Sequence, residues 1–101
     1  MITKASPSEA NGTSLKGYIQ ASLEQLYDAF DDAHFFRPSS LEKVQIEWIL
    51  KFEDGTIATI YDWKKDGYIP FSDEEVEWHI GGHTSEAVAL VRQALGISKF
   101  N

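Results

Sequence analysis

The chain has 101 residues, of which 43% are hydrophobic and 13% aromatic, which is too apolar for a disordered polypeptide and enough for one modest core. Its formal net charge of −7 argues against direct binding to a nucleic-acid backbone, because that needs clustered Lys and Arg. The absence of cysteine excludes disulfides and thiolate metal sites.

Residues 1–14, MITKASPSEANGTS, combine Ser, Pro, Asn, Gly and Thr with little apolar content. They lack the apolar stretch of a signal peptide, and no segment of the chain approaches the roughly 18 apolar residues of a membrane span. We therefore expect a cytoplasmic protein in which residues 1–14 form a mobile arm and residues 15–101 form a single domain.

The first predicted elements of this domain are a strand at Leu15–Gln20 and a helix that begins after Ser22. Ser22 and Gln25 have the spacing of a capping box, in which each side chain bonds to the other residue's backbone N–H group. The apolar residues that recur at helical spacing are Leu23, Leu26, Tyr27 and Phe30.

The stretch DDAHFFRPSS follows this helix, and Pro38 with two serines marks it as a loop. His34 and the aromatic pair Phe35 and Phe36 interrupt its polar character. These side chains form either an exposed patch or a cluster tucked under the edge of the sheet. We favour the second interpretation, because large apolar side chains are usually covered.

The clearest pattern covers residues 42–63, EKVQIEWILKFEDGTIATIYDW. The apolar residues that alternate in its first half are Val44, Ile46, Trp48, Leu50 and Phe52. Asp54 and Gly55 favour a two-residue type I′ turn, which would place Trp48 opposite Tyr61 and build one broad aromatic face. The residues after the turn that this register assigns to that face are Ile57, Thr59, Tyr61 and Trp63.

The same register places Glu47 opposite Asp62 on the other face, where Glu77 and His79 join them if a third strand lies beside Asp62. Such a group can bind a divalent cation or act as an acid–base pair. We favour a solvated face neutralised by neighbouring lysines, because a flat sheet does not supply the tight geometry of a metal site. We expect no metal and no cofactor.

The stretch Val76–Ile80, VEWHI, is a third alternating strand, and Gly81 with Gly82 ends it. HTSEAVALVRQALG then predicts a helix capped by Thr84 or Ser85. The expected buried stripe of this helix is Ala87, Leu90, Val91, Ala94 and Leu95, and Gly96 is its expected end.

The resulting order β-α-β-β-β-α predicts an α+β domain with an antiparallel sheet of about four strands. Both helices would lie on one face of the sheet and cover the aromatic side chains. The other face would be mixed in character and at least partly open.

Gly81 and Gly82 permit a nest of backbone N–H groups just before the last helix, whose N-terminus carries partial positive charge. A phosphate or nucleotide could bind there, with its surrounding donors from His79, His83, Thr84 and Ser85. The alternative is structural: the glycines take positive φ and turn the chain. We favour this alternative, because GG-x-[ST] is neither a P-loop nor a G-x-G-x-x-G pattern.

Catalysis finds little support in the sequence. There is no G-x-S-x-G elbow, and the three histidines, His34, His79 and His83, form neither an H-x-x-x-H nor an H-E-x-x-H motif on one helix. A metal-dependent hydrolase on the face that holds Glu47 is a weak third hypothesis. We therefore do not expect an enzyme.

The stretches GYIQASLEQLYDAF, VQIEWILKFEDGTIATIYDWK and EWHIGGHTSEAVALV resemble a family of small proteins from tailed bacteriophages and related mobile elements. The likeness covers Gly17 to Leu95, and its motifs describe strands and turns, so no catalytic residue is transferred. It implies an accessory factor that acts inside a bacterial host, in a class that commonly inhibits host defences such as CRISPR effectors. The chain departs from its relatives in its longer N-terminal arm and in DDAHFFRP, where they carry a short Gly-Pro turn.

We therefore expect a non-catalytic protein that binds and inhibits a host protein with a basic surface. The acidic residues proposed for this contact are Asp31, Asp32, Glu47, Asp62, Asp73, Glu74, Glu75 and Glu77. The alternative is an anion or nucleotide binder at the Gly81-Gly82 turn. A second copy of the chain is a further candidate partner, because bare apolar sheet faces attract partners.

Overall fold

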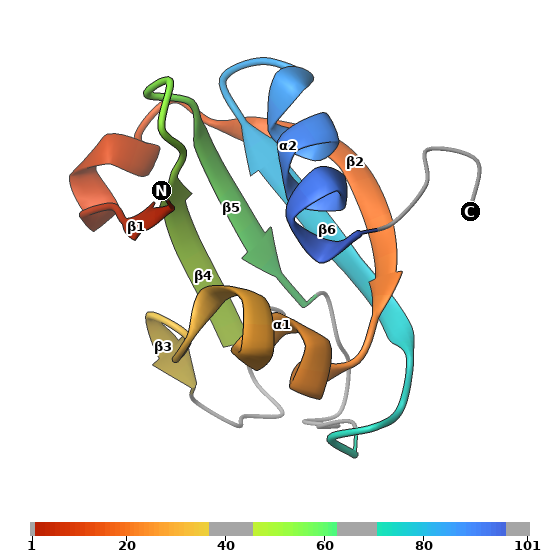
Figure 1. Cartoon of the computed structure of the whole chain (residues 1–101). Coiled ribbons are helices and arrows are strands. Elements are labelled where there is room, and N and C mark those ends of the chain that lie inside the picture. The colour runs from red at the N-terminus through yellow and green to blue at the C-terminus, as the bar shows by residue number, and fades with distance from the viewer. Residues whose placement is uncertain (1, 37–45, 63–70, 97–101) are drawn as a thin grey trace.

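The computed structural model describes residues 2–36, 46–62 and 71–96, which form one antiparallel sheet with two α-helices on one face (Figure 1). The elements in chain order are β1 (Thr3–Lys4), the 3-10 helix η1 (Pro7–Ala10), β2 (Ser14–Ala21), α1 (Leu23–Phe30), β3 (Phe35–Phe36), β4 (Ile46–Lys51), β5 (Ile57–Tyr61), β6 (Val76–Gly82) and α2 (Glu86–Leu95). The α+β prediction is confirmed. Neither α1 nor α2 is long and apolar enough to cross a membrane.

The strand order β1-β4-β5-β6-β2 makes β2 one edge of the sheet, and β1 and β3 share the outer edge of β4. The predicted four strands correspond to β2, β4, β5 and β6. The two additional strands, β1 and β3, have two residues each. They pair with opposite ends of β4, so its outer edge is covered in two short pieces.

Helix α1 begins as predicted from its capping box. The Gln25 N–H donates to the Ser22 hydroxyl at 3.2 Å, and the Ser22 N–H donates to the Gln25 side-chain oxygen at 2.9 Å. The helix buries Leu23, Leu26 and Phe30 against the sheet. Its apolar stripe and its cap therefore favour the same helix from two independent signals.

The core face of the sheet is centred on two tryptophans from β4 and β6. Trp48 and Trp78 are fully buried, and their rings meet edge to face with centroids 5.9 Å apart. Each indole N–H has a backbone acceptor at 2.9 Å, the Asp31 carbonyl for Trp48 and the Ala21 carbonyl for Trp78. Both polar atoms are thereby satisfied inside an apolar cluster.

Helix α2 ends at Gly96, which has a φ of 73°, as predicted. Its N-terminal residue Ser85 makes no side-chain capping bond, so the predicted cap is not formed by this side chain. Ala87 and Val91 are buried against the sheet, Leu90 and Leu95 are partly buried against the same core, and only Ala94 of the predicted buried positions is exposed.

The hairpin between β4 and β5 differs from the prediction by one residue. The Phe52 N–H donates to the Thr56 carbonyl at 2.9 Å, which leaves three loop residues, and of these only Gly55 has a positive φ, at 90°. A type I′ turn is therefore wrong, because it needs two such residues. The Asp54 carboxylate instead accepts the Thr56 N–H at 3.0 Å and stabilises the longer loop.

This shift reverses the two faces of β5. Trp48 lies opposite Ile60, and Glu47 lies opposite Tyr61 and not opposite Asp62. The predicted assignment of Ile57, Thr59 and Tyr61 to the helix-covered face is wrong. The residues of β5 in the helix-covered cluster are Ala58 and Ile60. Trp63 lies outside the described residues.

The segment before Leu15, expected to be a mobile arm, carries β1 and η1 and lies against the sheet in the structure (Figure 1). Ala5 is buried in a small second cluster with Ile49 and Ile57, on the face away from the helices. The ring of His34 links this segment to β4. Its Nδ1 accepts the Ile49 N–H at 3.1 Å, and its Nε2–H donates to the Ala5 carbonyl at 2.7 Å.

The backbone of His34–Phe36 therefore lies at the edge of the sheet, whereas the covered position that we favoured for the Phe35 and Phe36 side chains lies outside what the structure describes. The backbone of Phe35–Phe36 forms β3 on β4, and the His34 N–H donates to the Glu47 carbonyl at 2.7 Å. His34 is half-buried between β1 and β3. It is a structural link between two short edge strands.

Candidate functional site

The face of the sheet away from the helices carries a row of four side chains, one from each long strand. Tyr18 on β2 pairs with His79 on β6, His79 pairs with Tyr61 on β5, and Tyr61 pairs with Glu47 on β4. Their neighbours Ile19, Trp48, Ile60 and Trp78 all belong to the core cluster on the other face. Because side chains alternate along a strand, the four residues project from the opposite face, and we call them the stripe.

The aromatic end of the stripe is held by ring contacts. The Tyr18 and His79 rings meet edge to face with centroids 4.9 Å apart, and the Tyr61 and His79 rings are tilted with centroids 5.4 Å apart. Tyr18 is 44% exposed, and His79 and Tyr61 are half-buried. Three rings thus lie in one line across the open face, and Tyr18 is the most exposed of them.

The carboxylate end of the stripe is electrostatically unfavourable for a negative charge. Burial raises the pKa of Glu47, and the nearby charge of Asp62 raises it further. Burial also raises the pKa of Tyr61, with smaller contributions from Glu47 and Tyr18. Both shifts indicate a partly desolvated, negative environment where β4 meets β5.

Gly81 supplies the space beside the stripe. A Cβ atom at this position would collide with the Thr59 hydroxyl and would lie 3.5 Å from Cε1 of the Tyr61 ring. A side chain there would therefore compete with Tyr61 for the same surface. The glycine is used for close approach of neighbouring side chains.

The predicted anion site at the two glycines is not supported by this geometry. Gly81 and Gly82 belong to β6, which is paired with β2 on one side and β5 on the other. Neither has a positive φ, so the expectation that they turn the chain is also wrong. A Cβ atom on Gly82 would lie 2.6 Å from the Ala87 Cβ, so this glycine lets α2 pack closely on the sheet.

The other residues of that proposed anion site are separated by the fold. His79 projects with the stripe, whereas His83, Thr84 and Ser85 are exposed in the turn beyond β6. His83 and Thr84 line a pocket of about 260 Å³ together with Asp54 of the hairpin loop, whose negative charge disfavours an anion. The His83 ring contacts the Glu9 carbonyl at 3.3 Å.

The predicted acidic contact residues do not form one surface. Asp62 is fully buried, and its carboxylate accepts the Ile46 N–H at 3.0 Å, so its assignment to partner binding is wrong. Asp31 and Asp32 are exposed after α1. The turn before β6 holds the remaining cluster, with Asp73 and Glu75 exposed and Glu74 half-buried.

Of the predicted set, Glu47 and Glu77 project from the same open face, on β4 and β6 with β5 between them. Glu77 is exposed two residues before His79 on β6, opposite Gln20 of β2. Because Asp62 is fully buried, the metal site proposed from Glu47, Asp62, Glu77 and His79 is not formed. Within residues 2–36, 46–62 and 71–96 no group of three such side chains could hold a metal ion.

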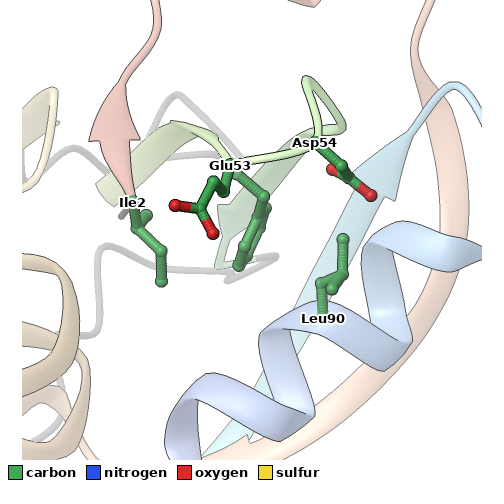
Figure 2. Close-up of a pocket in the computed structure, with 5 residues that line it drawn as sticks. Ile2, Glu53, Asp54 and Leu90 are labelled. Carbon is green, nitrogen blue, oxygen red and sulfur yellow. The ribbon is translucent and has the colours of Figure 1, made fainter.

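A pocket of about 420 Å³ lies between the N-terminal segment, the hairpin loop and α2. Figure 2 shows Ile2 and Leu90 on its two sides, with the carboxylates of Glu53 and Asp54 at its rim. Phe52 completes the apolar lining. The pocket offers neither a histidine nor a hydroxyl for acid–base or nucleophilic chemistry among its lining residues.

Sequence reasoning missed Tyr18 and Tyr61 as surface residues. It assigned Tyr61 to the core, because the Asp54-Gly55 pair was interpreted as a two-residue loop. The polar side chain of Thr56 and the Asp-x-Thr pattern could have indicated the longer loop, since Asp side chains bond to backbone N–H groups two residues on.

The chain matches no family model, no curated protein and no solved structure.

Proposed function

We propose that this protein is a non-catalytic binding protein that docks on a basic protein surface through the open face of its sheet. The observation that carries the proposal is the stripe of Tyr18, His79, Tyr61 and Glu47, uncovered by either α-helix. Tyrosine is among the residues that contribute most to protein interfaces, because it buries a large rigid ring and keeps a polar end.

The charge of the molecule favours a basic partner. The chain carries a formal net charge of −7, and the stripe is flanked by the exposed carboxylate of Glu77. An acidic face steers a basic partner and rejects an acidic one. The resemblance to phage accessory proteins suggests, as part of this proposal, a host defence protein with a basic nucleic-acid channel as the target.

A capture experiment from bacterial lysate at low salt tests the proposal. The informative variant is Tyr18→Ala with Glu77→Lys, which changes the open face at two exposed positions. Its matched control is Glu24→Lys, an exposed charge reversal in the first turn of α1. We expect one basic protein that is retained by the wild type and by the control, lost with the open-face variant, and released at about 0.5 M salt.

Two results would contradict this function. Equal capture by the wild type and the open-face variant would place the contact elsewhere. A wild-type protein that is a stable dimer by light scattering, and a monomer after Tyr18→Ala, would mean that a second copy covers the face.

A further inference from the structure

The two ends of the stripe offer different chemistry to the same ligand. Tyr18, His79 and Tyr61 present aromatic rings, whose faces attract cations, and Glu47 presents a carboxylate on the neighbouring strand. Tyr61 lies directly opposite Glu47 in the β4–β5 ladder. A ring and a carboxylate opposite each other on adjacent strands are close enough for one cationic group to contact both.

The local electrostatics favour a positive charge at this position. Both influences on Glu47, burial and the charge of Asp62, raise its pKa and therefore oppose its negative form. A cation placed beside Glu47 would stabilise the carboxylate and offset the repulsion from Asp62. Asp62 itself is fully buried and its carboxylate accepts the Ile46 N–H, so an arriving ligand meets Glu47.

Gly81 adds no side chain to the sheet surface beside Tyr61. A Cβ atom there would lie 3.5 Å from the Tyr61 ring and would collide with Thr59. Gly81 therefore places no side chain of its own beside the Tyr61 ring. A flat group is favoured over a bulky one on such a surface.

We propose that the stripe binds the guanidinium group of an arginine from the partner, placed on the Tyr61 ring and paired with the Glu47 carboxylate. This inference rests on the proposed function and names the side chain that the open face recognises. Guanidinium suits the position better than ammonium, because it is planar, stacks on aromatic rings and pairs with a carboxylate through two N–H groups.

The test uses small probes that need no knowledge of the partner. N-acetyl-argininamide is titrated into the full chain and followed by two-dimensional NMR at constant ionic strength. N-acetyl-citrullinamide is the neutral probe of the same shape, and N-acetyl-lysinamide is the ammonium probe. We expect saturable shifts at Tyr61, His79 and Glu47 with the arginine probe, and affinities lower by about tenfold or more with the other two.

Glu47→Gln is the diagnostic variant, and Glu24→Gln, an exposed carboxylate in the first turn of α1, is its matched control. We expect Glu47→Gln to weaken the arginine probe by about tenfold and Glu24→Gln to leave its affinity within about twofold. Spectra without probe check that both variants are folded. Equal binding of citrulline and arginine probes, or equal affinity of wild type and Glu47→Gln, would overturn the inference.

The two proposals fail in different ways. Capture of a partner that depends on Tyr18 and Glu77, without any response to the arginine probe, would leave the binding function standing and remove the arginine site. A specific response to the arginine probe at Glu47, without any face-dependent partner, would leave the site and remove the proposed protein target.

Discussion

The two faces of the sheet are built from the same strands and differ in what covers them. The core face is closed by α1 and α2 and carries Trp48 and Trp78, both fully buried. The other face is covered at one end by the N-terminal segment, through Ala5 on Ile49 and Ile57, and presents the stripe over the rest. One face therefore stabilises the fold, and the other carries the partner contact that we propose.

The difference shows that alternate side chains of one strand have different roles, since those on the core face stabilise the fold and those on the open face are the ones that we propose for recognition. Ile60 and Tyr61 are neighbours on β5, yet Ile60 is fully buried and Tyr61 is half-buried beside Glu47. A substitution at one position should act on folding and at the next on binding.

Trp48→Ala should produce the largest loss of stability. It removes a fully buried ring and leaves the Asp31 carbonyl without its indole donor, at a cost of about 3–5 kcal/mol. Tyr61→Ala, on the open face, should cost about 1 kcal/mol, because its ring is only half-buried. Chemical denaturation measures both values, and similar losses would contradict the division between the faces.

The core face was largely predictable from the sequence. The alternation of Ile46, Trp48 and Leu50 gave the correct buried side of β4, and the capping box at Ser22 gave the correct start of α1. These signals are local and redundant, since the periodicity of the apolar residues, the helix cap and the packing of the core all favour the same elements. The short strands β1 and β3 were missed because two residues carry no periodicity.

Gly82→Ala should be the next most damaging change. Its new Cβ would lie 2.6 Å from the Ala87 Cβ and 3.2 Å from two carbonyl oxygens, so the chain must shift at a cost of about 3 kcal/mol. Gly81→Ala should cost less, because it meets the end of the Thr59 side chain. Adding Thr59→Ala should restore the melting temperature of Gly81→Ala and leave that of Gly82→Ala low.

The open face was poorly predictable, and one hairpin residue explains why. A two-residue loop and a three-residue loop at Asp54-Gly55 place opposite sides of β5 against the helices. Ile57 lies on the outer face, where it packs in a second cluster with Ala5 and Ile49, and no local sequence pattern indicates this cluster. The position of Asp62 in the core therefore could not be read from its charge.

His34→Ala tests how firmly the N-terminal segment covers the open face. The variant removes the acceptor for the Ile49 N–H and the donor to the Ala5 carbonyl, at a cost of about 2 kcal/mol. Hydrogen exchange should rise at Ala5 and Ile49 before the rest of the sheet opens. His83→Ala is the control, since that ring is exposed and lies 3.3 Å from the Glu9 carbonyl, and it should change stability little.

Asp31→Gly should stabilise the protein where the chain leaves the core face after α1. Asp31 has φ 62° and ψ −155°, a backbone conformation that suits glycine and strains other residues. We expect a gain of about 1 kcal/mol, which corresponds to a rise in melting temperature of about 4–8 °C for a domain of this size. Asp32→Gly, at the adjacent exposed position, should give no gain, and a gain there would refute the strain argument.

Glu47→Gln should have the smallest effect, and the size of this effect depends on pH. Well below the ordinary glutamate pKa of 4.5, Glu47 is protonated in both the folded and the unfolded chain, so the variant should change stability little. As the pH rises through the raised folded-state pKa, the unfolded chain loses its proton first, and the wild type loses stability that the variant keeps.

The melting temperature of Glu47→Gln should therefore exceed that of the wild type at pH 7, with a difference that fades toward pH 4.5. Glu77→Gln, an exposed carboxylate on the same face, should show no such divergence. A wild type that gains stability relative to Glu47→Gln on raising the pH would mean that Glu47 has a cationic neighbour within the chain. The open face would then already hold the charge that we assign to a partner's arginine.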